Sequence, residues 1–283
     1  MLDISRKKVV ITGAAQGIGL ATVKRLIKEN CAITIWDFDQ QALAAAEREL
    51  KTLGAEVYCQ VCDITDEARV NELAVQAVRD MGQVDILINN AGCVIAGRFC
   101  SHPPAAWERE TKINLTSMYY TIYAFLPAML ERNSGHIVNI SSGAGLTGLP
   151  DLAVYCATKW AVYGLTESLR LEAMHDRKFG VRFSSIHPGI LKHGMFEGTR
   201  MNFLGEFFVP RLDSHDQIAE VIVEKALKRG KAMVMRPQGS QVGMILRGLF
   251  PDTLLNWMLL LSGAGGCMDH WTGRPGSKHA SNE

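Results

Sequence analysis

The chain has 283 residues, of which 47% are hydrophobic and 21% are charged, and its formal net charge is +1. This length suffices for one large domain, and the near-neutral charge excludes nucleic acid as a general electrostatic partner. The amino-terminal residues "MLDISRKKVV" carry no long apolar run after their charges, so a signal peptide is not expected.

Short β-branched runs alternate with helical patterns along most of the chain. In chain order, the predicted strands are residues 7–12, 31–37, 55–62, 84–90, 135–141, 181–189 and 231–235. The predicted helices lie at about 17–30, 39–53, 66–81, 105–132, from 154 onward, and 214–228. This alternation predicts an α/β fold, a Rossmann-like doubly wound parallel sheet with helices on both faces, which explains why the strands read as apolar throughout. No repeat or linker divides the sequence, so residues 1–283 are expected to form a single domain.

The seven cysteines are an odd number scattered through core-like segments. This pattern favours reduced thiols in a cytosolic protein over a disulfide framework. Cys59 and Cys62 have the C-x-x-C spacing of a redox or metal site, but they lie in an apolar run without a second pair. They are interpreted as small core residues, and no metal site is assigned.

The stretch "TGAAQGIG", residues 12–19, joins the first predicted strand to the first predicted helix. Gly13, Gly17 and Gly19 lie where a tight turn needs no Cβ and where the backbone must approach a pyrophosphate closely. The helix N-terminus supplies N–H groups and a positive dipole for the phosphates. The turn, with Gln16 and Ile18, is therefore predicted to bind a dinucleotide.

Asp37 ends the second predicted strand, eighteen residues after Gly19. A carboxylate there can accept hydrogen bonds from the adenosine ribose hydroxyls, and it would repel a 2′-phosphate. The glycine turn carries no cation that could hold such a phosphate. These features favour NAD over NADP, whereas the alternative makes Asp37 a solvated turn residue or helix cap.

Further motifs follow in a fixed order: "CDIT", "NNAG", Asn114, "NISSGAG", "YCATK" and "HPG". Together with the glycine turn and Asp37, they span residues 12–189 and resemble the short-chain dehydrogenase/reductase (SDR) family in its classical form. The resemblance implies a dinucleotide-binding and catalytic domain that assembles as a homodimer or homotetramer. It also implies further cofactor contacts by Asp63, Ile64, Asn90, Ala91, Gly92, Pro188, Gly189 and Ile190.

The resemblance further implies a catalytic set of Asn114, Ser142, Tyr155 and Lys159. The residue types suit the chemistry, because Tyr155 and Lys159 are four positions apart on one helical face and a nearby cation lowers the pKa of a tyrosine. Tyr155 is expected to take the proton of an alcohol, while Lys159 also binds the nicotinamide ribose and Ser142 holds the substrate oxygen. Asn114 is expected within a helix, with a water-mediated link towards Lys159. A second tyrosine, Tyr163, is set aside because Tyr155 has the family's spacing of thirteen residues from Ser142.

The stretch "HPGILKHG" departs from the family pattern. His193 stands where a threonine commonly bonds the nicotinamide carboxamide, and either His193 or Thr199 could take that role. His187 is interpreted as a residue of the strand end, and neither histidine is assigned to catalysis.

Residues 190–213 occupy the position of the family's substrate loop and are unusually apolar. The apolar residues are Met195, Phe196, Met201, Phe203, Leu204, Phe207 and Phe208. This composition favours a pocket for a lipophilic alcohol or ketone, such as a steroid, retinoid or long-chain compound. The alternative is that the residues only cover the core.

The segment at about 237–268 is also apolar, and its charge-free run from Thr253 to Met268 has 16 residues. That run is shorter than the roughly 20 residues that span a bilayer. Six Lys or Arg residues between Lys225 and Arg247 would suit an anionic membrane surface. A subunit interface or hydrophobic cover is preferred, so the expected location is cytoplasmic, with peripheral membrane contact as the alternative.

The leading functional hypothesis is an oxidoreductase that transfers a hydride between NAD(H) and a secondary, lipophilic alcohol or ketone. One alternative is an NAD-binding regulatory or scaffold protein with little turnover, although such a protein has no chemical need for Tyr155 together with Lys159. A second alternative is an NADP-dependent carbonyl reductase, which Asp37 opposes.

Overall fold

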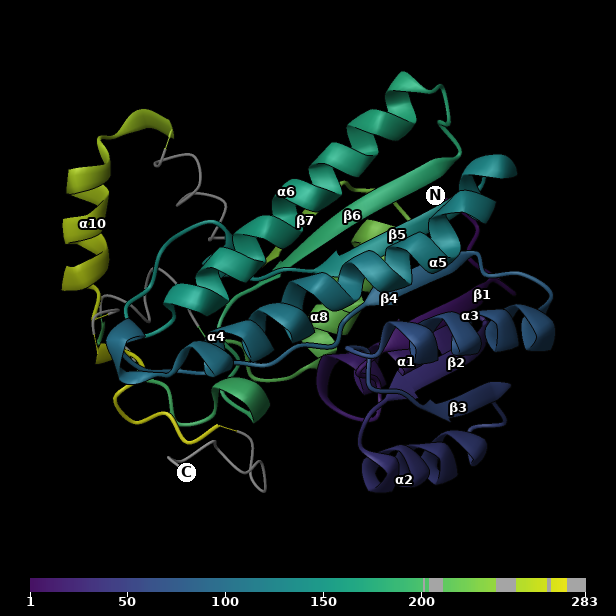
Figure 1. Ribbon diagram of the computed structural model, residues 1–283, viewed down its shortest axis with the longest axis horizontal. Coiled ribbons are helices and arrows are strands. Elements are labelled where there is room, and N and C mark those ends of the chain that lie inside the picture. Colours follow the sequence, from purple (N-terminus) through teal and green to yellow (C-terminus); the bar gives the residue numbers. More distant parts are fainter. Residues whose placement is uncertain (201, 204–210, 238–247, 264–265, 274–283) are drawn as a thin grey trace.

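The computed structural model describes residues 1–200, 202–203, 211–237, 248–263 and 266–273. Its centre is a seven-stranded sheet with the order β3-β2-β1-β4-β5-β6-β7, in which every pair is parallel (Figure 1). The strands are β1 (Lys8–Thr12), β2 (Ala32–Asp37), β3 (Val57–Val61), β4 (Ile86–Asn89), β5 (Gly135–Ile140), β6 (Val181–Pro188) and β7 (Met233–Arg236). The predicted Rossmann-like α/β fold is confirmed.

The helices alternate with the strands as the sequence predicts. The α-helices are α1 (Gly17–Ile27), α2 (Gln40–Lys51), α3 (Glu67–Met81), α4 (Pro104–Thr111), α5 (Ser117–Glu131), α6 (Ala153–His175), α8 (Asp216–Val221) and α10 (Asp252–Leu261). Two π-helical segments, η2 (Lys112–Thr116) and η5 (Ile222–Leu227), continue α4 and α8. Short 3₁₀ turns are η1 (Phe99–Ser101), η3 (Gly143–Gly145) and η4 (Gly194–Phe196).

Each face of the sheet has its own apolar core. On one face, strand residues such as Ile11 and Ile33 pack with Val23 of α1 and with residues of α2, α8 and η5. On the other face, Val10 and Leu87 pack with residues of α3, α5 and α6. Strands covered on both sides must be apolar on both sides, which is why the sequence pattern does not alternate.

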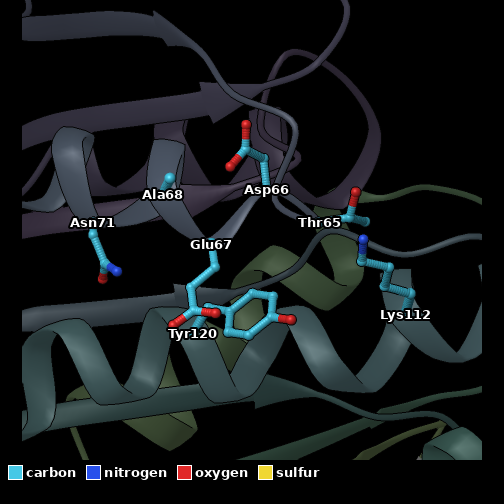
Figure 2. Close-up of a pocket in the computed structure, with 7 residues that line it drawn as sticks. All are labelled: Thr65, Asp66, Glu67, Ala68, Asn71, Lys112 and Tyr120. Carbon is cyan, nitrogen blue, oxygen red and sulfur yellow. The ribbon is translucent and has the colours of Figure 1, made fainter.

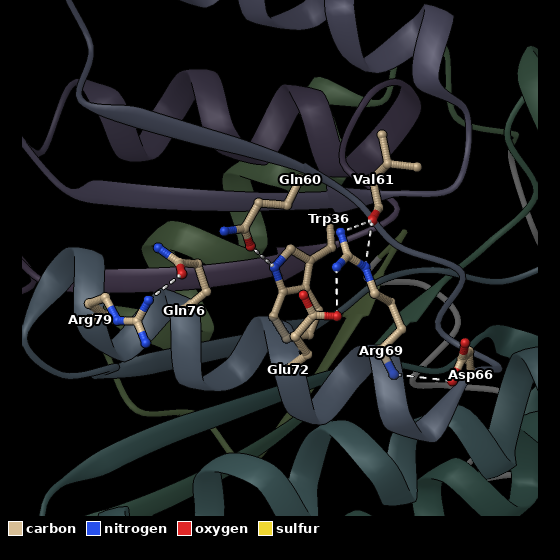
Figure 3. Close-up of polar contacts among 8 residues, drawn as sticks. All are labelled: Trp36, Gln60, Val61, Asp66, Arg69, Glu72, Gln76 and Arg79. Atoms are coloured by element: carbon tan, nitrogen blue, oxygen red, sulfur yellow. Dashed lines mark hydrogen bonds and ion pairs between the residues drawn. The ribbon is translucent and has the colours of Figure 1, made fainter.

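β3 forms one edge of the sheet and has no fully buried residue, unlike β7 at the other edge, which buries Val234 and Met235. Polar contacts hold it instead: the Trp36 indole N–H donates to Gln60 Oε1 at 2.8 Å, and the Arg69 guanidinium donates to the Val61 carbonyl at 3.2 and 3.3 Å (Figure 3). Arg69 also pairs with Glu72 on α3. β3 is therefore less buried than the inner strands, because an edge strand leaves one side to solvent, although its residues still pack on both faces of the sheet.

Cys59 in β3 and Cys62 directly after it pack on opposite faces of the sheet. Cys59 lies against the cluster that includes α1, and Cys62 belongs to the cluster under α3 and α5. Burial raises the pKa of the two thiols to about 11 and about 12. These placements agree with the interpretation of both cysteines as packing residues.

The strand order creates a switch point between β1 and β4, from which the chain winds in both directions. In open α/β sheets, ligands bind in the crevice outside the carboxyl ends of the strands at such a point. The glycine turn follows β1, and the "NNAG" turn follows β4. The fold therefore brings two of the predicted cofactor-binding motifs together.

The described parts of the segment at 237–268 include an exposed helix, α10, and a buried stretch at Cys267 and Met268. Helix α10 leaves Leu254, Trp257, Leu260 and Leu261 exposed, and it lies apart from the sheet (Figure 1). Cys267, by contrast, is buried in a cluster with residues of α6. The cover interpretation thus fits this end of the segment, while α10 remains a candidate for subunit or membrane contact; residues 238–247 and 264–265 lie outside the described residues. None of the described helices combines the length and the apolar character required to span a bilayer.

We predict that Gly164→Ala stabilises the protein by about 1 kcal/mol, because alanine has a higher helix propensity than glycine. Gly164 is exposed within α6, and an added Cβ would meet no atom within 4 Å. Urea unfolding measures the change. As the control, Gly180→Ala should destabilise, because its Cβ would collide with the Asn133 carbonyl. Equal effects of the two substitutions would contradict the packing described here.

Candidate active site

A cavity of about 1210 Å³ runs along the carboxyl ends of the strands. Most of the predicted site residues line it. They are Gly13, Gln16, Gly17, Ile18, Asp37, Asp63, Ile64, Asn90, Ala91, Gly92, Ser142, Tyr155, Lys159, Pro188 and Gly189. Gly19, Asn114 and Ile190 stand behind this lining, and Ile190 contributes a carbonyl that accepts the Leu212 N–H at 2.8 Å.

The glycine turn is held by close backbone contacts. Gly13 has a φ of +62°, and a Cβ there would lie 2.7 Å from Ala91 Cα. A Cβ on Gly19 would lie 2.5 Å from the Gly13 carbonyl oxygen and 2.7 Å from Asn90 Nδ2. Gly13 therefore adopts a left-handed backbone conformation that favours glycine. The missing Cβ of Gly19 lets α1 lie close to the turn.

Thr12 and Asn90 join the glycine turn to the turn after β4. The Thr12 hydroxyl accepts the N–H groups of Asn90 and Ala91, both at 3.1 Å. The Asn90 amide donates to the carbonyls of Thr12 and Gly13 at 3.0 and 2.8 Å. These bonds fix the two loops that form the phosphate end of the cavity.

Asp37 is 5% exposed and faces the glycine turn. Its carboxylate accepts the N–H groups of Ala15 at 3.0 Å and Asp39 at 3.1 Å. Asp37 is therefore neither a solvated turn residue nor the cap of α2, which is Asp39. Asp63, farther along the same edge, accepts hydrogen bonds from the backbone and the hydroxyl of Thr65.

Ser142, Tyr155 and Lys159 meet where β5 ends and α6 begins. The Tyr155 hydroxyl hydrogen-bonds to Ser142, whose Oγ also accepts the Ala144 N–H at 3.1 Å. Lys159 Nζ donates to the Ile140 carbonyl at 3.0 Å and lies 5.6 Å from the centre of the Tyr155 ring. All three side chains are buried, so their charges act in a medium of low dielectric constant.

Burial dominates the ionisation of this group. It raises the pKa of Tyr155 above its usual value of about 10, while the bond to Ser142 lowers it. Burial also lowers the pKa of Lys159 to about 8. Tyr155 is thus protonated at neutral pH in the structure as it stands, and it needs added positive charge to act as a base.

The sequence predicts a regular helix at Asn114. The structure places this residue in the π-helical turn η2, between α4 and α5. Its Oδ1 accepts the Cys93 N–H at 2.8 Å, and its Nδ2 donates to the Cys93 carbonyl at 2.9 Å. A π-helical turn shifts the side chains that follow it, and such turns are frequent at functional sites. In this turn, the Asn114 side chain hydrogen-bonds the backbone of the segment after β4, beside Lys159.

His187 is buried behind the catalytic group. Its Nδ1 lies 3.1 Å from the Ser142 carbonyl oxygen, and its Nε2 lies 3.0 Å from Ser185 Oγ. Burial lowers the pKa of His187 to about 4, so the ring is neutral at physiological pH. The interpretation as a strand-end residue fits, with the addition that the ring supports the backbone of Ser142.

The substrate loop and the carboxyl-terminal segment close the other end of the cavity. The Phe196 ring meets the Tyr155 ring edge-on at 5.6 Å. The Trp271 indole lines the cavity and donates to the Met195 carbonyl at 2.9 Å. Of the other apolar loop residues, Phe203 is 82% exposed, and Met201, Leu204, Phe207 and Phe208 lie outside the described residues.

The two candidates for the missing threonine are placed differently. His193 lines the cavity. Thr199 is buried, and its hydroxyl donates to the Phe196 carbonyl at 2.8 Å. Of the two residues, only His193 lines the cavity, and the role of either one stays a prediction.

A second hollow of about 630 Å³ lies beside the main cavity (Figure 2). It is open and polar, and it shares Thr65 and Lys112 with the main cavity. We assign it no function.

Sequence reasoning missed Thr12, Glu110 and Trp271. Glu110 is buried one helical turn before Asn114, so its position on the same helical face was a usable signal. Trp271 lies more than a hundred residues from Tyr155 in sequence, and no local pattern predicts their meeting.

Comparisons with known proteins give relatives across nearly the whole chain. The chain is 34% identical over 257 residues to short-chain dehydrogenase/reductase family 16C member 6 of Bos taurus, which covers 90% of this chain and 80% of that protein. It is 30% identical over 250 residues to human epidermal retinol dehydrogenase 2 (88% and 80% covered) and 30% identical over 255 residues to rat estradiol 17-beta-dehydrogenase 11 (90% and 83%).

Solved structures agree with this result. A short-chain dehydrogenase/reductase from Burkholderia phymatum in complex with NAD has a TM-score of 0.78 and 26% identity, over 90% of this chain and 97% of that chain. A metagenomic short-chain oxidoreductase in complex with NADP has a TM-score of 0.68 and 30% identity, over 83% and 98%. The family model for short chain dehydrogenases matches residues 7–202, which is well over half of the sequence. This chain therefore belongs to the short-chain dehydrogenase/reductase family of oxidoreductases.

Proposed function

We propose that this protein oxidises secondary, lipophilic alcohols with NAD and catalyses the reverse reduction of the ketones. The observation that carries the proposal is the meeting of Ser142, Tyr155 and Lys159 at the cavity that begins at the glycine turn. Family membership supports hydride transfer, and the side chains at the two ends of the cavity support the choice of cofactor and substrate.

The residues present fit a dinucleotide. Gly13 and Gly17, with the N-terminus of α1, provide a cradle for the pyrophosphate that a Cβ at Gly13 would disturb. Asp37 offers a buried carboxylate for the adenosine ribose, and Asp63 and Ile64, which line the same cavity, would contact the adenine. Lys159 is placed to hold the nicotinamide ribose. Because solved relatives bind either NAD or NADP, the preference for NAD rests on the negative charge of Asp37.

When bound, oxidised NAD supplies a hydride acceptor and a positive charge near Tyr155. The Tyr155 phenolate is favoured by the Lys159 ammonium on the neighbouring turn, whose Nζ lies 5.6 Å from the centre of the tyrosine ring. Tyr155 then takes the hydroxyl proton of the alcohol, while Ser142 donates a hydrogen bond to the substrate oxygen as negative charge develops. In the reverse direction, Tyr155 returns the proton to the carbonyl oxygen.

The substrate end of the cavity supports an apolar substrate. Met195, Phe196 and Trp271 line it beside the Tyr155 hydroxyl, and such walls bind through the burial of apolar surface. Two of the relatives are named for retinol and for estradiol, both of which are lipophilic alcohols. We infer the same substrate class for this chain, with secondary alcohols as the first compounds to test.

Tyr155→Phe should bind NADH as the parent protein does and lose turnover by about 10²–10⁴-fold, because the proton acceptor is removed while the ring is kept. Tyr163→Phe is the matched control, since Tyr163 packs edge-on against His187 and does not line the cavity. NADH formation at 340 nm over a panel of steroid, retinoid and long-chain alcohols measures turnover. Unchanged activity of Tyr155→Phe would refute the catalytic assignment.

Asp37→Asn should lower the preference for NAD over NADP by about tenfold, because it removes the repulsion of a 2′-phosphate and keeps an acceptor for the Ala15 N–H. The ratio of kcat/KM for the two cofactors with one alcohol gives the preference. If the parent protein already prefers NADP, the role proposed for Asp37 is wrong.

Trp271→Ala should raise KM for the best lipophilic alcohol by about tenfold or more and leave NADH affinity unchanged, because it removes apolar wall only at the substrate end. The control is Trp257→Ala, which truncates an exposed tryptophan of α10. Equal KM values for the two variants would show that Trp271 does not contact the substrate.

A further inference from the structure

Glu110 is an ionisable group in the site that the proposed reaction does not use. Glu110 is the penultimate residue of α4 and is only 1% exposed. Its Oε1 accepts the Ile95 N–H at 3.1 Å. A glutamate is almost never fully buried unless it is paired, so its placement calls for a partner charge.

The backbone after β4 brings Glu110 into the same cluster as Lys159. Asn114 and Glu110, one helical turn apart, bind successive parts of this backbone, at Cys93 and at Ile95. Above Gly92, the position of an added Cβ would be 3.1 Å from Asn114 Oδ1 and 3.5 Å from Lys159 Nζ. Glycine at this position therefore leaves room for the lysine ammonium beside the segment that Glu110 holds.

The charge of Lys159 depends on its neighbours. Burial lowers its pKa to about 8, and Cys93 and Glu110 act in the opposite direction. Burial also raises the pKa of Cys93 to about 12, so its thiol is neutral where Lys159 titrates. Glu110 then supplies the negative charge, since burial raises its pKa only to about 7, against the opposing influence of the Ile95 N–H and Lys159.

We propose that Glu110 is a positioning residue that keeps Lys159 protonated in its buried site and so sets the alkaline limit of the acid–base centre. Only the consequence for the acid–base centre rests on the proposed function. The electrostatic effect on Lys159 requires only that both side chains are buried against the same segment, Glu110 at Ile95 and Lys159 beside Gly92, whatever reaction the site performs.

The signs of the effects follow from the groups around Glu110. Lys159, Tyr155 and Cys156 face it from α6, Cys93 faces it from the segment after β4, and Arg109 precedes it on α4. As pH rises through about 7, Glu110 gains its charge and raises the pKa of Lys159, which extends the range in which the lysine is cationic. The same charge raises the pKa of Tyr155. Because a pH profile of turnover combines the two effects, Lys159 must be titrated directly.

The test compares the full-length protein with Glu110→Gln, which keeps an acceptor for Ile95, and with Glu110→Met, which does not. Each is labelled with [ε-¹³C]lysine, and the Lys159 signal is assigned by its loss in Lys159→Met. In both Glu110 variants we expect the Lys159 midpoint to fall by roughly one pH unit. Glu131→Gln makes the same chemical change at an exposed position near the end of α5 and should leave the midpoint in place.

NADH affinity, followed by nucleotide fluorescence, gives a second readout. At pH 6 both Glu110 variants should match the parent protein, because Glu110 is protonated there and Lys159 is charged in all three. Above pH 7 the variants should lose affinity at a lower pH than the parent. This also shows that a variant with a shifted midpoint is folded.

An unchanged Lys159 midpoint in both variants would overturn the proposal. A defect confined to Glu110→Met and present at every pH would also overturn it, because it would assign Glu110 only the hydrogen bond to Ile95. Failure to oxidise any alcohol would instead count against the proposed function and would leave the lysine titration intact, so the two failures are distinguishable.

Discussion

The structure depends on placing a lysine ammonium in a buried site at the end of β5. Lys159 Nζ has the Ile140 carbonyl as a hydrogen-bond acceptor, and the Tyr155 ring lies within 5.6 Å. A buried charge is costly unless polar groups surround it. The chain meets this requirement from several elements, with the bare backbone of Gly92 beside the ammonium, Asn114 next to it and Glu110 behind the same segment. The same cost makes the lysine useful, because the favourable effect of its charge on a phenolate is strongest where water is excluded.

The cofactor end obeys a different constraint, which is the close approach of two loops. The loops after β1 and β4 are adjacent because the strand order reverses between these strands. Thr12 and Asn90 saturate the backbone groups that would otherwise face the cavity, and Gly19 lets α1 start close behind the turn. The carboxylate of Asp37 then accepts the Ala15 N–H, so the residue that we propose to distinguish the two cofactors by charge also holds the glycine turn in place.

The two ends of the cavity differ in how they are built. The cofactor end consists of loops fixed close to the sheet by hydrogen bonds between the Thr12 and Asn90 side chains and the backbone. The substrate end consists of side chains from η4 and from residues 266–273, tied together by the Trp271 bond to Met195 and by backbone bonds such as Thr272 to Glu197. A site of this kind allows the substrate wall to change while the chemistry stays in place, because the wall contributes no group to proton transfer.

The sequence by itself determined the order of strands and helices, the glycine turn and the residue types of the catalytic set. These features are local: a strand, a turn or a helical face is written in residues a few positions apart. The tertiary structure decided which distant residues share a site. It buried Glu110, turned Asn114 inward through a π-helical turn and packed Trp271 against the cluster that contains Tyr155. It also left β3 only partly buried at an edge of the sheet, although its residues pack on both faces. Such pairings depend on packing between elements that no short-range pattern encodes, because burial and electrostatic proximity exist only once the chain is folded.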